Sequence, residues 1–214
     1  MSIADEIAEY KAFKEPIKNK HKKEIKKIMT TKVVTGKVRF SFCYLFEPQE
    51  GLGGGDPKYS VTLLIPKSDT ATINKIKAAI AEARENFCAK NGANALPAKP
   101  VHTLKDGDGT KDNGDDFGPE CRGHYVIKVR STKQPIVVDA FLNEITNPAE
   151  VYGGCYGRAS INFFGYNTAG QKGISATLLS VQKLHDGEPF GTVGSAADFD
   201  DDYRDPEADD DFMG

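Results

Sequence analysis

Short runs of alternating apolar and polar residues dominate the chain and predict a mainly β protein. The first run starts at Thr31 (TKVVTGKVRFSFCYLF) and the second covers residues 58–66 (KYSVTLLIP). Both are rich in the β-branched and aromatic residues that strands favour, and the turn-forming GLGGGDP between them predicts a long hairpin. Further strands are predicted over residues 124–130, 135–139, 154–166 and 173–184.

One segment has the periodicity of a helix instead. Its apolar stripe consists of Ile73, Ile76, Ile80 and Phe87. Ser68 or Asp69 can cap the start of this helix, and Asn91-Gly92 ends it. Because helices and strands do not alternate along the chain, a doubly wound α/β fold is disfavoured.

Five principal strands with one helix suit two architectures. A five-stranded Greek-key barrel of oligonucleotide-binding (OB) type, with the helix as an insertion, removes exposed strand edges and is the smallest common solution. A β-sandwich has the same strand signature. The alternation pattern alone does not separate the two.

Strand alternation also assigns residues to opposite faces of the predicted sheet. In 124–130, Ile127 and Val129 face the core, while Lys128 and Arg130 face outward. In 58–66, the apolar residues again share one face, and Lys58, Ser60 and Thr62 are expected outside.

The strand over 154–166 has an unusual outward face. Small or apolar residues from Cys155 to Phe163 occupy the inner positions. The outer positions include Tyr156, Arg158, Phe164 and Tyr166. A strand that is merely solvated does not need three aromatic rings and an arginine on its outer face.

The first strand carries an aromatic stripe, formed by Phe40, Phe42, Tyr44 and Phe46. We favour a packed core position for this stripe, since aromatic residues at a period of two are usually buried. Lys37 and Arg39 lie opposite and are then exposed. A bulge at Gly36 would bend the strand and re-aim part of the stripe, which keeps Tyr44 and Phe46 as candidates for a surface role.

Charge divides the chain into three regions. The 214 residues carry a net charge of −3. Residues 1–39 hold 11 Lys and Arg against 5 Asp and Glu, whereas residues 198–214 hold one Arg against 9 acids. Blocks of like charge stay solvated. We therefore expect a basic N-terminal extension (1–30), a folded domain (31–193) and a disordered acidic tail (194–214).

Several classes of protein are disfavoured. No apolar run is long enough to span a membrane, and the first residues lack the features of a secretory signal. The four cysteines are far apart, as expected for free thiols in a reducing compartment. The DGDGTKDNGDD segment (106–116) lacks the Gly and Glu positions of a calcium loop. We expect no metal, no cofactor and no enzymatic activity.

Basic residues interleaved with exposed aromatic rings suit single-stranded nucleic acid. Lys and Arg neutralise phosphates, and aromatic rings stack on unpaired bases without reading their sequence. The candidate DNA-binding residues are Lys37, Arg39, Tyr44, Phe46, Lys58, Lys128, Arg130, Tyr156, Arg158, Phe164 and Tyr166.

The acidic tail fits this hypothesis in two ways. Its carboxylates can occupy a basic groove in place of phosphates. Its end, Asp209, Asp210, Asp211 and Phe212, can also present an aromatic ring and charge to a basic, apolar pocket on another protein.

Five segments together resemble a known family. They are KVRFSF (37–42), KYSVTLLIPK (58–67), VYGGCYGRASINFFGYN (151–167), KGISATLLSVQKL (172–184) and DGEPFG (186–191). In this order they resemble the phage-encoded single-stranded DNA-binding proteins of tailed-phage replication modules.

The resemblance implies an OB-like barrel, sequence-independent binding of single-stranded DNA, and a role in phage DNA replication, recombination or repair. It also implies recruitment of replication or recombination proteins by the tail, in the cytoplasm of an infected bacterium. Whether the protein forms homo-oligomers stays open. The alternative hypothesis is a virion structural or assembly protein with a β-sandwich fold.

Overall fold

The computed structural model describes residues 31–50, 55–111, 113–168 and 171–191. The expectations for the basic extension (1–30) and the acidic tail (194–214), including Asp209, Asp210, Asp211 and Phe212, lie outside these residues.

The described residues form one sheet of nine strands, one long helix and two short 3-10 helices. The strands are β1 (Lys32–Val34), β2 (Val38–Gln49), β3 (Lys58–Pro66), β4 (Val101–His102), β5 (Leu104–Asp106), β6 (His124–Ser131), β7 (Ile136–Val138), β8 (Tyr156–Thr168) and β9 (Gln171–His185). The helices are α2 (Thr70–Asn91), η1 (Pro119–Cys121) and η2 (Pro148–Glu150).

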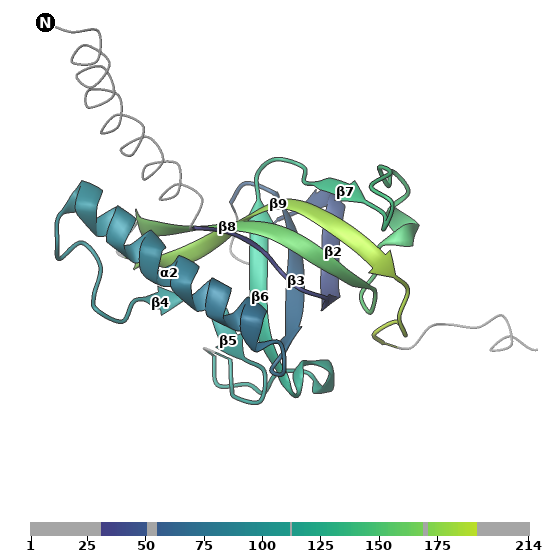
Figure 1. Ribbon diagram of the computed structural model, residues 1–214, viewed down its shortest axis with the longest axis horizontal. Helices are drawn as coiled ribbons and strands as arrows, with labels where there is room; N and C mark the ends of the chain where they lie inside the picture. Colours follow the sequence, from purple (N-terminus) through teal and green to yellow (C-terminus); the bar gives the residue numbers. More distant parts are fainter. Residues whose placement is uncertain (1–30, 51–54, 112, 169–170, 192–214) are drawn as a thin grey trace, which may run out of the picture.

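The five longest strands pair in a closed ring. β8 pairs with β2, β2 with β3, β3 with β6, β6 with β9, and β9 again with β8. In Figure 1, β8 and β9 cross in front of β2, β3 and β6. These are the five principal strands that the sequence predicts, and the predicted run at 135–139 contains β7; the described sheet has three further short strands. β1 lies within the first predicted run, whereas β4 and β5 contain two and three residues, which is too short for alternation to identify them.

The predicted helix is confirmed as α2. Asp69 caps its start, because the Asp69 carboxylate accepts a hydrogen bond of 3.0 Å from the amide of Thr72. Gly36 lies against this end of the helix and donates its amide to the Thr72 hydroxyl at 2.8 Å. A Cβ at Gly36 would collide with the Asp69 carboxylate. Gly36 separates β1 from β2 at the start of α2, and the register with β8 shifts by one residue across it, from Val34 opposite Ser160 to Val38 opposite Gly157, as the predicted bulge requires.

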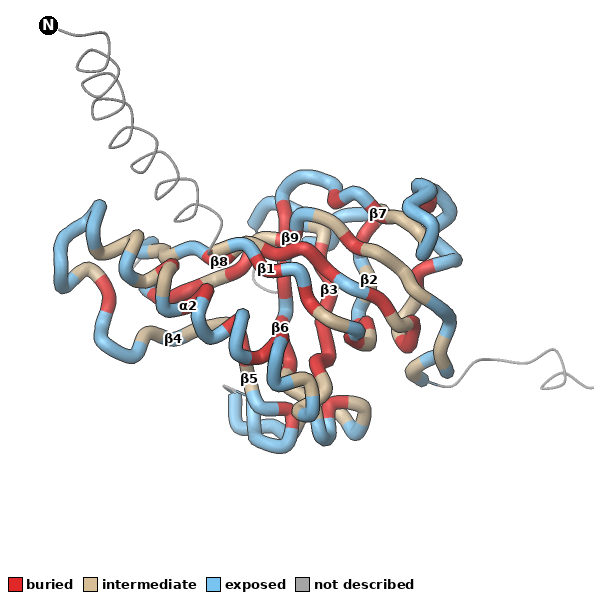
Figure 2. Tube along the Cα trace, in the orientation of Figure 1, coloured by how far each residue is buried: buried red, intermediate tan, exposed pale blue. Residues whose placement is uncertain are grey.

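The core lies inside the strand ring and under α2 (Figure 2). The inward faces predicted for β3, β6 and β8 are confirmed: Leu63, Ile127 and Ile161 are completely buried. Ile73, Ile76 and Ile80 of α2 add to the same cluster. The helix packs mainly on β8 and β1.

The expectation of a packed aromatic stripe on β2 is wrong at two of its four positions. Phe40 is buried, but Phe42 is 61% exposed and Tyr44 39% exposed. Phe42 has a φ of 49°, and the register with β3 shifts between Ser41 and Tyr44. This bulge reverses the alternation, so Leu45 enters the core in place of the neighbouring aromatic residue.

The outer face of β3 is more covered than expected. Ser60 and Thr62 were expected outside, but they are only 5% and 8% exposed. At the far end of the same face, Leu64 joins Cys121 and Val126 in a second apolar cluster, against which Phe117 and Phe190 pack. The loop before β6 and the segment after β9 therefore cover one end of this face.

Candidate nucleic-acid interface

A cross-strand row of residues runs over the outer side of β2, β3 and β6. Tyr44 pairs with Ser60, and Ser60 pairs with Arg130. Arg130 also faces Thr177 on β9. Residues paired directly across strands point to the same side of a sheet. The Tyr44 ring and the Arg130 guanidinium thus flank a small buried serine.

A second row repeats this arrangement two residues along the strands. Ser41 pairs with Thr62, and Thr62 pairs with Lys128. Lys128 and Arg130 are exposed, and among the described residues neither side chain forms an ion pair. We call Tyr44, Ser60, Thr62, Lys128 and Arg130 the open face.

The two cations of the open face repel each other. Partial desolvation on the sheet, and after it the charge of Arg130, lower the pKa of Lys128. A phosphate placed between the two side chains would neutralise this repulsion. The open face therefore combines an aromatic ring, buried hydroxyl groups and two cations that gain from an anionic ligand.

Three further aromatic and basic residues lie on or beside the β2–β3 hairpin. Lys58 is exposed and pairs with Gln49 near the end of the hairpin. Phe46 is half-buried against the core, so only part of its ring is accessible. Sequence reasoning missed Phe42 as a surface residue, because only the bulge exposes it, and no sequence signal marks a non-glycine residue at positive φ.

Arg39, Lys37 and Tyr156 form a separate cluster. The Arg39 guanidinium lies 4.2 Å from the Phe190 ring centroid and 5.4 Å from that of Tyr156. It also donates hydrogen bonds to the carbonyl oxygens of Gly154 and Glu188. Arg39 thus fastens the segment after β9 to β2. Lys37, 5.5 Å from the Tyr156 ring, is exposed beside it.

Arg158 lies apart from both groups. Its Nε donates to the carbonyl of Thr35 at 3.1 Å, and it lines a cleft of about 510 Å³ between β1, β8 and α2 with Lys32 and Lys75. Tyr156 and Arg158 both lie on β8, beside Lys37 and Thr35 respectively, whereas Arg130 lies on β6 opposite Ser60. These three candidates therefore do not share one cross-strand row.

Phe164 and Tyr166 lie near the β8–β9 turn. Phe164 is 41% exposed and pairs with Ser175. Tyr166 is half-buried, and its ring covers Gly173, where an added Cβ would come within 3.2 Å of the Tyr166 hydroxyl. Ser175 lies two positions before Thr177, which connects this pair to the Arg130 row.

Lys67 forms ion pairs with the acidic residues at the end of β5 and in the loop after it. Lys67 contacts the carboxylates of Asp106 and Asp108 at 2.6 and 2.7 Å. Asp108 also accepts the amide of Gly123 at 2.8 Å. Within the described ranges, no group of three or more His, Cys, Asp or Glu side chains could hold a metal ion. No helix in this part of the chain is long and apolar enough to span a membrane.

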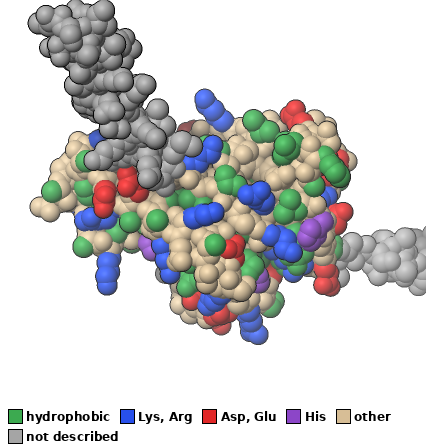
Figure 3. Space-filling view, viewed as in Figure 1, with side chains coloured by type: hydrophobic (Ala, Val, Ile, Leu, Met, Phe, Trp, Pro, Cys, Tyr) green, Lys and Arg blue, Asp and Glu red, His purple; other side chains and the backbone are tan. Residues whose placement is uncertain are grey.

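Basic side chains are spread over the β8 side of the molecule. Figure 3 shows Lys and Arg across the middle of this face, with Asp and Glu mostly toward its edges. The open face belongs to β2, β3 and β6, which lie behind β8 and β9 in this view. Cations are therefore available on more than one side of the sheet.

Comparison with known proteins identifies related phage proteins. Residues 31–213 match the model of a family described as "Enterobacter phage Enc34, ssDNA-binding protein". The chain is 35% identical to "Putative protein p50" of Acyrthosiphon pisum secondary endosymbiont phage 1, over 79% of this chain and 93% of that protein.

Two solved structures are similar to the fold. The single-stranded DNA-binding protein of bacteriophage Enc34, in complex with ssDNA, has 36% identity and a TM-score of 0.66, over 76% of this chain and 90% of that one. The bacteriophage T7 protein gp2.5, also a single-stranded DNA-binding protein, has 16% identity and a TM-score of 0.53, over 78% and 98% of the two chains. The T7 likeness concerns the fold alone.

Proposed function

Because the chain belongs to the family of the phage Enc34 ssDNA-binding protein, we propose that it binds single-stranded DNA without reading the base sequence. The family it matches and the solved structures with a similar fold are described as single-stranded DNA-binding proteins and not as enzymes, in agreement with the sequence analysis. The virion-assembly alternative has no such support. The closed ring of five long strands supports an OB-type Greek-key barrel as its architecture.

One observation supports the position of the DNA best. Lys128 and Arg130, unpaired within the described chain, stand beside the half-exposed Tyr44 over buried Ser60 and Thr62. In OB folds the outer face of the second and third barrel strands binds oligonucleotides, and here these strands are β3 and β6. Lys128 and Arg130 would bind phosphates, and Tyr44 would stack on a base.

The other candidate DNA-binding residues lie on either side of the open face. Lys58 and Phe42 flank the open face at the β2–β3 hairpin, and Phe164 and Tyr166 continue it past Thr177. Lys37 and Tyr156 form a second basic and aromatic patch. Arg39 and Arg158 already donate to backbone carbonyls, so we assign them positioning roles beside the DNA.

The tail and the biological role complete the proposal. The carboxylates of residues 198–214 would compete with phosphates for the open face, and Asp209–Phe212 would recruit replication or recombination proteins. The protein would act in phage DNA replication, recombination or repair in the host cytoplasm. A chain ending at Gly194 should bind DNA more tightly at low salt; unchanged affinity would contradict competition by the tail.

The test is fluorescence anisotropy with a labelled oligo-dT strand and a labelled duplex of equal length. We expect binding to the single strand to weaken linearly with the logarithm of salt, with a slope of roughly −0.7 per phosphate contact. Equal affinity for the duplex, or no binding to either, would reject the function. Incubating the strand with the protein and Mg²⁺ should leave its length unchanged.

A further inference from the structure

Two adjacent apolar side chains are presented to solvent on the loop after β7. Phe141 is 86% exposed and Leu142 71% exposed. We call this pair the apolar knob. Neighbouring exposed apolar residues mark an interaction site far more often than single ones do.

The loop that carries the knob is held rigidly by one carboxylate. Asp139 accepts hydrogen bonds of 2.8 Å from the amides of both Phe141 and Asn143, and one of 2.9 Å from the Asn143 side chain. The Asn143 side-chain hydrogen bond is the main cause that lowers the pKa of Asp139. Leu142 has a φ of 70° within this turn. The loop backbone therefore loses little conformational entropy when the knob binds a partner.

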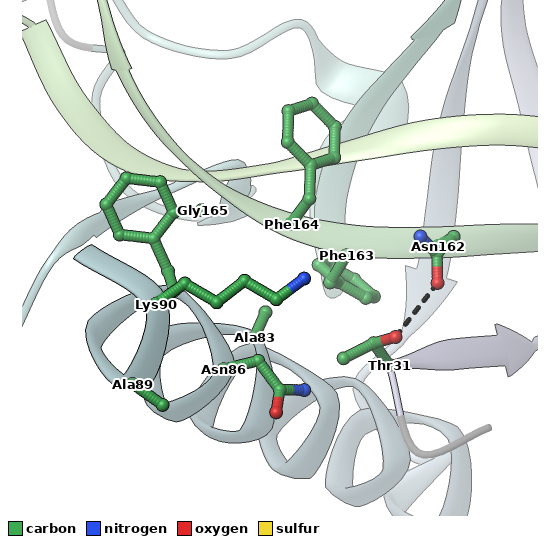
Figure 4. Close-up of a pocket in the computed structure, with 10 residues that line it drawn as sticks. Thr31, Ala83, Asn86, Ala89, Lys90, Asn162, Phe163, Phe164 and Gly165 are labelled. Carbon is green, nitrogen blue, oxygen red and sulfur yellow. Dashed lines mark hydrogen bonds between the residues drawn. The ribbon is translucent and has the colours of Figure 1, made fainter. Parts of the chain in front are cut away.

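The same protein contains an apolar groove between α2 and β8 (Figure 4). Its volume is about 600 Å³. Phe87 and Ala83 of α2 and Phe163 of β8 supply apolar lining, while Ala89 and Lys90 lie toward the end of the helix. Pockets of this size accept ligands much larger than one side chain. We call it the α2–β8 groove.

The knob and the groove lie at opposite ends of the molecule. In Figure 1, β7 and the loop after it are at one end, and the C-terminal half of α2 is at the other. Along β9, β7 pairs at Val181, whereas the groove residue Phe164 pairs at Ser175. Six residues of strand span about 20 Å. A knob therefore cannot reach the groove of its own molecule.

The charges beside the apolar knob and beside the α2–β8 groove are of opposite sign. Glu144 follows the knob and is exposed. The Lys90 side chain extends along the groove toward β8 (Figure 4). An incoming knob would bring Glu144 toward a cation at the groove rim, and opposite charges at the rim favour one orientation of docking.

We propose that the apolar knob of one molecule binds in the α2–β8 groove of a second copy of this chain. The contact is heterologous, because it joins two different surfaces. Such contacts build open chains unless the rotation between copies closes a ring. A row of copies would bind a long DNA strand cooperatively. The contact itself needs no DNA, so its test is independent of the proposed function.

The experiment uses two full-length variants. The knob variant carries Phe141→Ser and Leu142→Asn, since Asn tolerates the positive φ of this position. The groove variant carries Ala89→Glu and Lys90→Glu, which keep good helix formers and repel Glu144. Sedimentation velocity without DNA, over a range of concentrations, measures the assembly state.

We expect the wild-type mass to rise with concentration and each variant to remain monomeric. An equimolar mixture of the two variants should form a dimer and stop there, because one intact knob meets one intact groove. On a long oligo-dT strand, each variant should lose affinity by on the order of tenfold, since bound neighbours no longer help each other.

Other results would overturn the proposal. A wild type that stays monomeric at every concentration would show that the knob does not bind a second copy. Variants that assemble like the wild type, or a mixture that forms no dimer, would exclude the knob–groove contact. Val101→Thr controls for loss of an exposed apolar residue. Lys77→Glu with Ala81→Glu controls for charge on another face of α2.

Discussion

The outer surface of β3 and β6 differs sharply between its two ends. At one end, Leu64 and Val126 are buried beneath Cys121, Phe117 and Phe190. At the other end, the open face has hydroxyl groups on β3 and exposed cations on β6. The same pair of strands thus has one end sealed by apolar contacts and one end left polar. Stability and ligand binding should therefore respond to different residues on a single face.

The largest effect is expected at the covered end. Leu64 is completely buried, so Leu64→Ala should lower the free energy of unfolding by about 2–5 kcal/mol, as buried leucine truncations do. Urea denaturation measures this change. Thr62→Val, two residues along the same face, keeps the side-chain shape and should cost far less. A comparable loss from both variants would remove the distinction between the two ends.

The next largest effect is expected from the cations of the open face. Replacing Lys128 and Arg130 together by Gln should weaken oligo-dT binding by about 2–4 kcal/mol. The salt slope should become shallower by roughly 1.4, which is 0.7 for each lost phosphate contact. Anisotropy over a salt series measures both changes. Lys99→Gln with Lys111→Gln removes equal charge elsewhere and should leave the slope nearly unchanged.

The stability of this variant provides a separate check. The pKa of Lys128 is lowered in the folded protein, so its charge opposes folding at neutral pH. This penalty decreases as the pH rises through the folded-state pKa and is gone above the pKa of the unfolded chain. Lys128→Gln should therefore leave the urea midpoint unchanged or slightly higher at pH 7. A clear fall in the midpoint would show that Lys128 serves the fold and not a ligand.

Tyr44 should contribute through stacking and not through charge. Tyr44→Ala should cost about 1–3 kcal/mol of binding free energy, the usual worth of one stacked base. The salt slope should stay the same, since no cation is removed. Tyr44→Phe keeps the ring and should restore most of the affinity. If Tyr44→Ala alters the slope as much as the double cation variant, the two residues do not have separate roles.

Local signals in the sequence predicted much of the fold. The alternation of β6 predicts the inward Ile127 and the outward Arg130, and the sequence offers Ser68 or Asp69 as the helix cap, of which Asp69 forms the hydrogen bond to Thr72. These features depend on neighbours within a few residues. The five long strands follow from the same kind of signal.

The features that were missed depend on distant contacts. The bulge at Phe42 reverses alternation on β2 and carries no sequence signal, so Tyr44 was expected in the core. The burial of Ser60 and Thr62 comes from the strands on either side of β3. The role of Arg39 depends on Gly154 and Glu188, more than a hundred residues away. Periodicity contains no information on such contacts.

The smallest effect concerns the loop that leads to the covered end. Lys67 at the end of β3 contacts Asp106 and Asp108, and its hydrogen bonds are the main cause that lowers the pKa of both carboxyl groups. A carboxyl group whose pKa is lowered on folding stabilises the folded state at pH values above its unfolded-state pKa of about 3.9. This contribution is lost as the pH falls through the folded-state pKa.

Lys67→Gln should therefore lower the urea midpoint slightly at pH 7, and the difference from the wild type should disappear at low pH, once both carboxylates are protonated. Lys111→Gln, in the same loop but without a carboxylate partner in the described chain, should show no pH-dependent difference. A Lys67→Gln deficit that persists in acid would mean that Lys67 acts through packing on Tyr125, whose ring centroid lies 5.5 Å from its ammonium. Apolar contacts alone would then stabilise the covered end, and this end would differ even more from the polar open face.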